Sequence, residues 1–166
     1  MPAKPSCSYC GKPANHTRGD YPFPESGIAN ITLHDIPLIR CRHCGTVDPL
    51  IPRMDDEMRL LVLAIADKPC RLQGSDVRYL RNYLDMTQED FARQLGVDKT
   101  TLSKWETGDD TIGEQSDRLI RVVALSLAKG LEDKIEAVVS HFPNIKGHKP
   151  RLRIAMAPKT MTYEYA

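Results

Sequence analysis

Two cysteine pairs near the start of the chain constrain its fold more than any other feature. Cys7 and Cys10 form one C-x2-C-G motif, and Cys41 and Cys44 form a second, with residues 11–40 between them. Four thiolates at this spacing can close one tetrahedral site, which most often holds Zn²⁺. The glycine after each motif lets the backbone turn back on itself. The sequence therefore predicts that two distant segments meet around one structural zinc ion per chain.

A site with four protein ligands has no open position for a catalytic water. For this reason, the sequence predicts that the protein is not an enzyme. His43 lies between two of the cysteines and could be a fifth ligand, but the usual coordination number favours an exposed loop residue. Cys70, the one cysteine outside the motifs, is expected to be a spectator thiol.

The segment between the cysteine motifs has the pattern of a β-strand. Residues 27–34 alternate apolar with small or polar side chains, and residues 36–40 continue the pattern up to the second motif. Together with the cysteines, this predicts a small β-rich zinc ribbon over residues 1–53. Because so small a ribbon would bury little core, we expect metal binding to contribute most of its folding free energy.

The rest of the chain up to residue 143 is predicted to be helical. A linking helix over residues 55–67, within a linker at 54–73, is apolar on nearly all sides and should be buried on more than one side. Residues 76–84 then begin an all-α domain over 74–143, which ends with helices at 115–129 and 131–142. The apolar set expected for the helix at 115–129 is Leu119, Ile120, Val122, Val123 and Leu127. The apolar stripe of the last helix is either core or a dimer surface.

Residues 87–108 contain two short helical patterns that are joined by a turn. Thr87 is placed to cap the first helix, and Asp98 is placed to cap the second. Gly96 suits the turn between them, and Gly108 is a natural stop. The segment therefore predicts a helix-turn-helix, whose second helix enters the major groove of DNA. An ordinary helical hairpin is the alternative.

In the second helix, Leu102 and Trp105 should face the core, which leaves its polar residues for DNA. Gln88 begins the preceding helix, where backbone amides can meet a phosphate. The residues expected to contact DNA are Gln88, Lys99, Thr100, Thr101, Ser103, Lys104 and Arg81.

The charge distribution gives little general support for binding to nucleic acid. The chain has a net charge of +1, and residues 75–110 carry five basic against eight acidic side chains. Non-specific binding depends on neutralised phosphates, so an acidic segment should bind DNA weakly in this way. Specific binding should therefore rest on a few directed contacts and on dimer symmetry. No apolar run reaches the roughly 18 residues of a membrane span, and no signal peptide pattern opens the chain. We therefore expect a cytoplasmic protein with no membrane partner.

Residues 144–166 form a basic extension, in which two strands could flank residues 157–159. Its basic residues are Lys146, Lys149, Arg151, Arg153 and Lys159, against the single acid Glu164. The extension could be an arm for the DNA backbone, a strand that binds a partner, or a mobile tail.

The run from Arg78 to Gly108 resembles the Cro/C1-type (XRE) helix-turn-helix. Thr87-Gln88 matches the start of its second helix, and Trp105-Glu106-Thr107-Gly108 matches the end of its third. In similar domains, an arginine on the first helix pairs with the glutamate before the closing glycine. Since Arg81 and Glu106 occupy these places, the resemblance implies that they pair, with Arg81 near the DNA backbone.

The order of the segments resembles the MqsA family of YgiT-type zinc-finger antitoxins and related regulators, over about residues 5–130. The segments 25–33 and 74–81 look like its ribbon strand and its helix entry. The resemblance implies an α+β fold: a four-cysteine zinc ribbon that holds a cognate toxin, and a helix-turn-helix domain that forms a homodimer and represses its own operon at a palindromic operator in double-stranded DNA. It implies base contacts at Thr100 and Lys104. The alternative is a stand-alone transcriptional regulator without a toxin.

Overall fold

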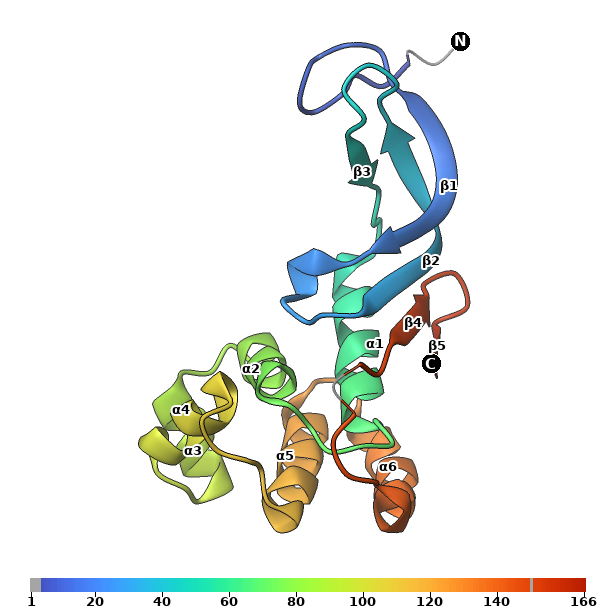
Figure 1. Ribbon diagram of the computed structural model, residues 1–166. Coiled ribbons are helices and arrows are strands. Elements are labelled where there is room, and N and C mark those ends of the chain that lie inside the picture. Colours follow the sequence, from blue (N-terminus) through green and yellow to red (C-terminus); the bar gives the residue numbers. More distant parts are fainter. Residues whose placement is uncertain (1–3, 150) are drawn as a thin grey trace.

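The computed structural model describes residues 4–149 and 151–166 as a sheet, a central helix and a group of further helices (Figure 1). The strands are β1 (Asn15–Pro22), β2 (Ile31–Arg40), β3 (Val47–Pro49), β4 (Ile154–Ala157) and β5 (Thr162–Tyr165). The helices are α1 (Met54–Ala66), α2 (Gly74–Tyr83), α3 (Gln88–Leu95), α4 (Lys99–Thr107), α5 (Glu114–Leu127) and α6 (Ile135–His141), with 3-10 turns at Pro24–Ser26, Glu132–Lys134 and Phe142–Asn144. The predicted α+β class is confirmed.

Strand β2 organises the five-stranded sheet. The antiparallel β1 runs along one side of it. Its other side is shared by β3, which pairs with Leu38–Arg40, and by β4, which runs parallel to Ile31–Leu33. Between these two halves, Asp35 has a φ of 49°. At this point β2 has one residue more than β1 between the pairs Gly19–Ile36 and Tyr21–Leu33. The extra residue resets the alternation, as in a β-bulge, so that Leu33 and Ile36 are both buried.

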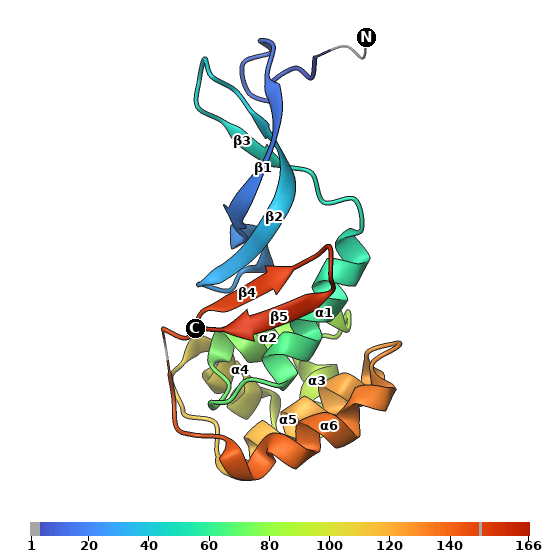
Figure 2. The ribbon, with the colours of Figure 1, turned by 90° about the vertical axis from the view of Figure 1, so that its right-hand side faces the viewer.

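The C-terminal strands belong to the same sheet as the N-terminal ones (Figure 2). Ile154 and Met156 of β4 are buried in the main core. The hydroxyl of Tyr163 donates a hydrogen bond to Asp67 Oδ2 at 2.9 Å, and that of Tyr165 donates to the backbone oxygen of Ala64 at 2.6 Å. The two predicted strands are therefore confirmed, and they anchor the extension to the end of α1.

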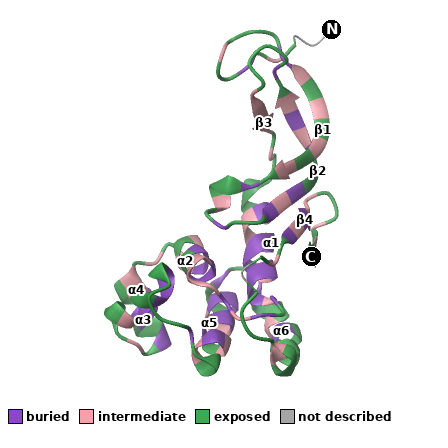
Figure 3. Ribbon diagram, in the orientation of Figure 1, coloured by how far each residue is buried: buried purple, intermediate pink, exposed green. Residues whose placement is uncertain are grey.

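Helix α1 is buried on more than one side, as its sequence predicts. It lies between β4 and β5 on one side and α2 and α5 on the other, and Leu61, Ala64 and Ile65 have no exposed surface (Figure 3). One continuous core runs from β2 through α1 to the helix-turn-helix. The expectation that the ribbon buries little core is wrong for its lower half, the part of the sheet around Ile31–Leu33 where β2 pairs with β4. There the inner face of β2 packs into this shared core. The cysteine end has only a small separate cluster.

Helix α5 buries a different face from the one its apolar residues predict. Of the expected set, only Ile120 is buried, whereas Leu119 and Leu127 are each 43% exposed. The core face carries the ion pair between Arg121 and Asp117, whose side chains are 1% and 2% exposed. A polar pair in the core therefore turns the apolar stripe outwards. No helix in the described ranges is long and apolar enough to cross a membrane.

Candidate metal centre and nucleic-acid interface

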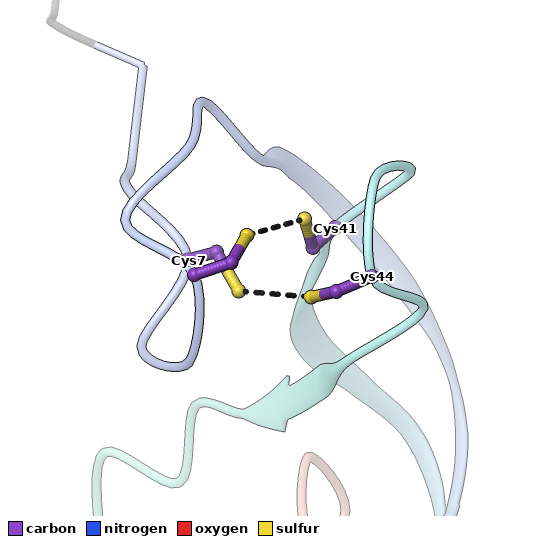
Figure 4. Close-up of side chains that lie close together, drawn as sticks. Cys7, Cys41 and Cys44 are labelled. Atoms are coloured by element: carbon purple, nitrogen blue, oxygen red, sulfur yellow. Dashed lines mark hydrogen bonds between the residues drawn. The ribbon is translucent and has the colours of Figure 1, made fainter.

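The four cysteines of the two motifs meet at the far end of the sheet (Figure 4). The Sγ atoms of Cys7 and Cys44 lie 3.5 Å apart, those of Cys10 and Cys41 lie 3.6 Å apart, and all four lie within 4.8 Å of one another. Sulfurs placed about 2.3 Å from a central zinc ion would lie about 3.8 Å apart. The spacing and the soft donor set therefore fit a metal ion of this kind.

Both cysteine motifs have the same backbone geometry. The amide of Gly11 donates to the oxygen of Cys7 at 3.0 Å, and the amide of Gly45 donates to the oxygen of Cys41 at 3.0 Å. Both glycines have left-handed φ values, of 69° and 80°. Because a side chain is strained in this conformation, glycine is required for the turn that presents each sulfur pair.

Hydrogen bonds favour the metal-binding thiolate at Cys44 and Cys7 but not at Cys10. The hydroxyl and then the amide of Thr46 lower the pKa of the Cys44 thiol to about 6. The amide of Cys10 lowers the pKa of Cys7. At Cys10 the amide of Lys12 lowers the pKa, but burial and the hydrogen bonds with the other three sulfurs outweigh it and raise the pKa to about 12. Thiolate is the ligand form of cysteine. His43 lies outside the cluster: it is exposed, and its Nε2 is 2.5 Å from Lys12 Nζ.

The helix-turn-helix has nearly all the local features that the sequence predicts. Thr87 Oγ1 accepts a hydrogen bond from the amide of Asp90 at 3.1 Å, which caps α3. Gly96 and Gly108 adopt left-handed φ values of 67° and 81° at the ends of α3 and α4. Asp98 occupies the N-cap position of α4, but its side chain makes no capping hydrogen bond.

Helix α4 has a buried side and a polar outer side. Leu102 and Trp105 are 0% and 6% exposed, as predicted. The predicted polar residues of α4 are exposed at Lys99, Thr100 and Lys104 and half-exposed at Thr101 and Ser103. At these five positions the outer side of α4 therefore carries two ammonium groups and three hydroxyl groups. DNA contact by these residues remains a prediction.

Glu106 joins α2, α3 and α4 through one buried carboxylate. Its side chain is 1% exposed. Arg81 donates to it from Nε at 2.6 Å and from Nη2 at 3.1 Å, and Gln88 Nε2 donates to it at 2.8 Å. The predicted pair of Arg81 and Glu106 is confirmed. The hydrogen bond from Gln88 could not be predicted from the sequence, because it depends on how the helices pack.

A close approach of backbones also fixes α2 against α4. A Cβ atom at Gly74 would overlap the backbone oxygens of Trp105 and Glu106. The first turn of α2, where amides lack intrahelical partners, thus lies on the carbonyl end of α4. Only glycine allows this contact, which the sequence alone does not reveal.

Burial reduces the excess of acid in this region. Asp76 is 1% exposed on its side chain and pairs with Lys68 at 2.7 Å, and Glu106 is committed to Arg81. The pair of Asp76 with Lys68, which lies outside residues 75–110, lowers the local excess of acids from three to two. The pair of Glu106 with Arg81 removes one acid and one base, so it leaves the excess unchanged.

Comparison with protein families matches residues 77–115 to a helix-turn-helix family. A search of curated proteins and a search of solved structures returned no match. The matched region runs from α2 to the start of α5 and includes the whole outer side of α4. The match indicates a DNA-binding transcription regulator, and the matched family is generally not enzymatic. Outside the matched region, the four-cysteine cluster could hold a metal ion.

Proposed function

We propose that this protein is a sequence-specific transcriptional repressor that binds a palindromic operator as a homodimer. The observation that carries the proposal is the polar outer side of α4, held in place by the buried Glu106 network. The cysteine cluster holds one structural Zn²⁺, since four thiolates at tetrahedral spacing are the preferred donor set of that ion. Arg81 and Gln88 position α4, which is the helix that reads the DNA bases, and they lie near the phosphate backbone of the DNA.

Lys104 and Thr100 are the proposed base-reading residues. Lysine can donate to the O6 and N7 atoms of guanine, though as a single point charge and not as a fork. Threonine can contact a base edge or a thymine methyl group. Lys99, Thr101 and Ser103 lie beside them on α4.

Replacing Lys104 with alanine should weaken operator binding by about 1–3 kcal/mol, or about 5- to 150-fold, because a base contact is lost. Fluorescence anisotropy with the DNA upstream of the gene, at one fixed salt concentration, measures the effect. Binding to unrelated DNA should change much less. Lys129→Ala removes an exposed lysine beyond α5 and serves as the control. Equal affinities of the two variants for the operator would exclude α4 as the reading helix.

The exposed apolar stripe of α5 supports the homodimer. Leu119, Val123 and Leu127 follow one another at intervals of four residues, so they share one side of the helix. Leu119 and Leu127 are each 43% exposed, which leaves apolar surface without cover. A second copy of the chain is the occupant, because a palindromic operator requires a two-fold related pair of reading helices.

Replacing Leu119 with glutamate should convert the dimer to a monomer, because it places a charge in the apolar contact. Analytical ultracentrifugation gives the mass of the species, and far-UV circular dichroism checks that the exposed substitution leaves the fold intact. Lys129→Glu is the matched control. A dimer that persists in Leu119→Glu would rule out α5 as the interface.

The finer part of the proposal is an antitoxin role, in which the zinc-ribbon half holds a cognate toxin. It is supported by the order of the segments and by Tyr9, which is 82% exposed beside the cluster, as aromatic contact residues often are. A stand-alone regulator is the alternative. Copurification from the native host of a small nuclease encoded next to this gene would support the antitoxin. Recovery of operator DNA without any such protein would support the stand-alone regulator.

A further inference from the structure

A hollow of about 320 Å³ lies where the sheet meets the start of α1. Its walls come from β1 and β2, from the connector between β3 and α1, from the first turn of α1, and from the turn between β4 and β5. The apolar part of the lining is formed by Ile36, Pro37, Leu50, Ile51, Pro52 and Pro158. The volume is at the lower end of the range for small-molecule sites, and the mostly apolar walls are typical of them.

Glu57 lines this hollow and is an unusual residue to find there. It is only 3% exposed, and its side chain makes no hydrogen bond with any residue in the described ranges; its Oε2 atom is buried without a partner. Buried polar atoms in folded proteins almost always have a partner. Burial also raises the pKa of the Glu57 carboxyl. A nearby cation that enters the hollow would reverse this effect by favouring the charged form.

Lys159, in the turn between β4 and β5, is the second charged feature of the lining. It is exposed and forms no ion pair with any residue that the structure describes. The other charged residues of the lining are already paired: Arg18 Nε contacts Asp35 Oδ1 at 2.9 Å, and Arg53 contacts Asp56. Within the described residues, the lining thus offers one carboxyl and one ammonium group that form no ion pair, together with apolar side chains.

We propose that this hollow binds a small zwitterion with an apolar side chain, of the class of the apolar α-amino acids. The ligand's ammonium group contacts the Glu57 carboxylate, and its carboxylate contacts Lys159. Its side chain packs on the prolines and on Ile36. A carboxylic acid without an amine would leave Glu57 unpaired, and an amine without a carboxylate would leave Lys159 unpaired. Only a ligand with both charges satisfies both residues.

Titration of L-leucine into the full, zinc-loaded chain tests the proposal without DNA. Two analogues separate the charges: 4-methylpentanoate lacks the ammonium group, and 3-methylbutylamine lacks the carboxylate. Isothermal calorimetry should show that leucine binds at least about tenfold more tightly than either analogue. Amide NMR signals of the residues that line the hollow should shift with leucine. Equal affinity for an analogue, or no shift at the hollow, would overturn the proposal.

Substitutions connect the binding to the two unpaired residues. Glu57→Gln and Lys159→Gln should each weaken leucine binding by about tenfold or more, whereas Lys129→Gln, outside the hollow, should leave it unchanged. The melting temperature of ligand-free Glu57→Gln should not fall, because the substitution removes a buried carboxyl with no partner. That measurement separates loss of the ligand from loss of the fold. Unchanged leucine affinity in both variants would refute the site.

Discussion

Replacing Arg121 with alanine should lower the free energy of unfolding by about 3–5 kcal/mol, the cost of breaking a buried ion pair on one side. The guanidinium is 1% exposed and contacts Asp117 Oδ2 at 2.9 Å. It also donates to the backbone oxygens of Ala66, Lys68 and Cys70 at 2.9, 2.7 and 2.6 Å. These carbonyls belong to the end of α1 and the linker after it, where helix geometry leaves acceptors without partners. Alanine would remove the donor from these three carbonyl oxygens and would leave the buried carboxylate of Asp117 without its cation.

Arg118 provides the control on the same helix. Its side chain is 40% exposed and pairs with Glu114, which is 58% exposed. Since exposed pairs contribute little, Arg118→Ala should cost less than about 1 kcal/mol. Urea denaturation followed by circular dichroism measures both variants. Similar small losses for the two arginines would show that the Arg121 contacts do not hold α5 to α1.

Replacing Cys41 with serine should unfold the cysteine end of the ribbon and leave the lower half of the sheet folded. Structural zinc contributes about 10–16 kcal/mol of binding free energy in small zinc domains. Apart from the proposed zinc ion, the core of the cysteine end, within the described residues, is the small cluster of Cys7, Ala14 and Cys41, with Cys10 and Ile39 packed against it. In contrast, Leu33 and Met156 belong to the core that includes the helices. The effect should therefore stop within the sheet.

Hydrogen exchange can locate that boundary. Amides of Gly11 and Gly45, which donate to Cys7 and Cys41, should lose protection in Cys41→Ser, while those of α2 to α5 keep theirs. His43→Ser is the control, because His43 lies between Cys41 and Cys44 but outside the cluster. Removal of the proposed zinc ion with a chelator should reproduce the pattern. Loss of protection throughout the helices would show that the metal supports the entire fold.

Local chemistry explains which features could be predicted from the sequence. The caps at Thr87 and Gly108 and the turn at Gly96 depend on neighbouring residues, so they are visible in the chain itself. The cysteine cluster is predictable because its ligand spacing is characteristic. The pair of Arg81 and Glu106 followed from a family resemblance and not from periodicity.

The features that escaped prediction depend on packing between distant segments. The parallel pairing of β2 with β4 joins residues from opposite ends of the chain, and alternation within a strand does not identify its partner. Arg121 appears polar in the sequence, so the apolar pattern of α5 indicated the wrong buried face. The burial of Glu57 likewise depends on the sheet that covers α1, so the sequence of α1 does not predict it.

The pairing of β2 with β4 also has a consequence for synthesis on the ribosome. Ile31–Leu33 leaves the ribosome long before Ile154–Met156, and domains tend to fold as the chain emerges. Until β4 arrives, this stretch of β2 presents an unpaired strand edge, and the side of α1 that β4 and β5 cover remains open. Contacts of such long sequence separation form slowly, and free strand edges promote aggregation. The nascent chain should thus be most prone to aggregation just before its last strands emerge.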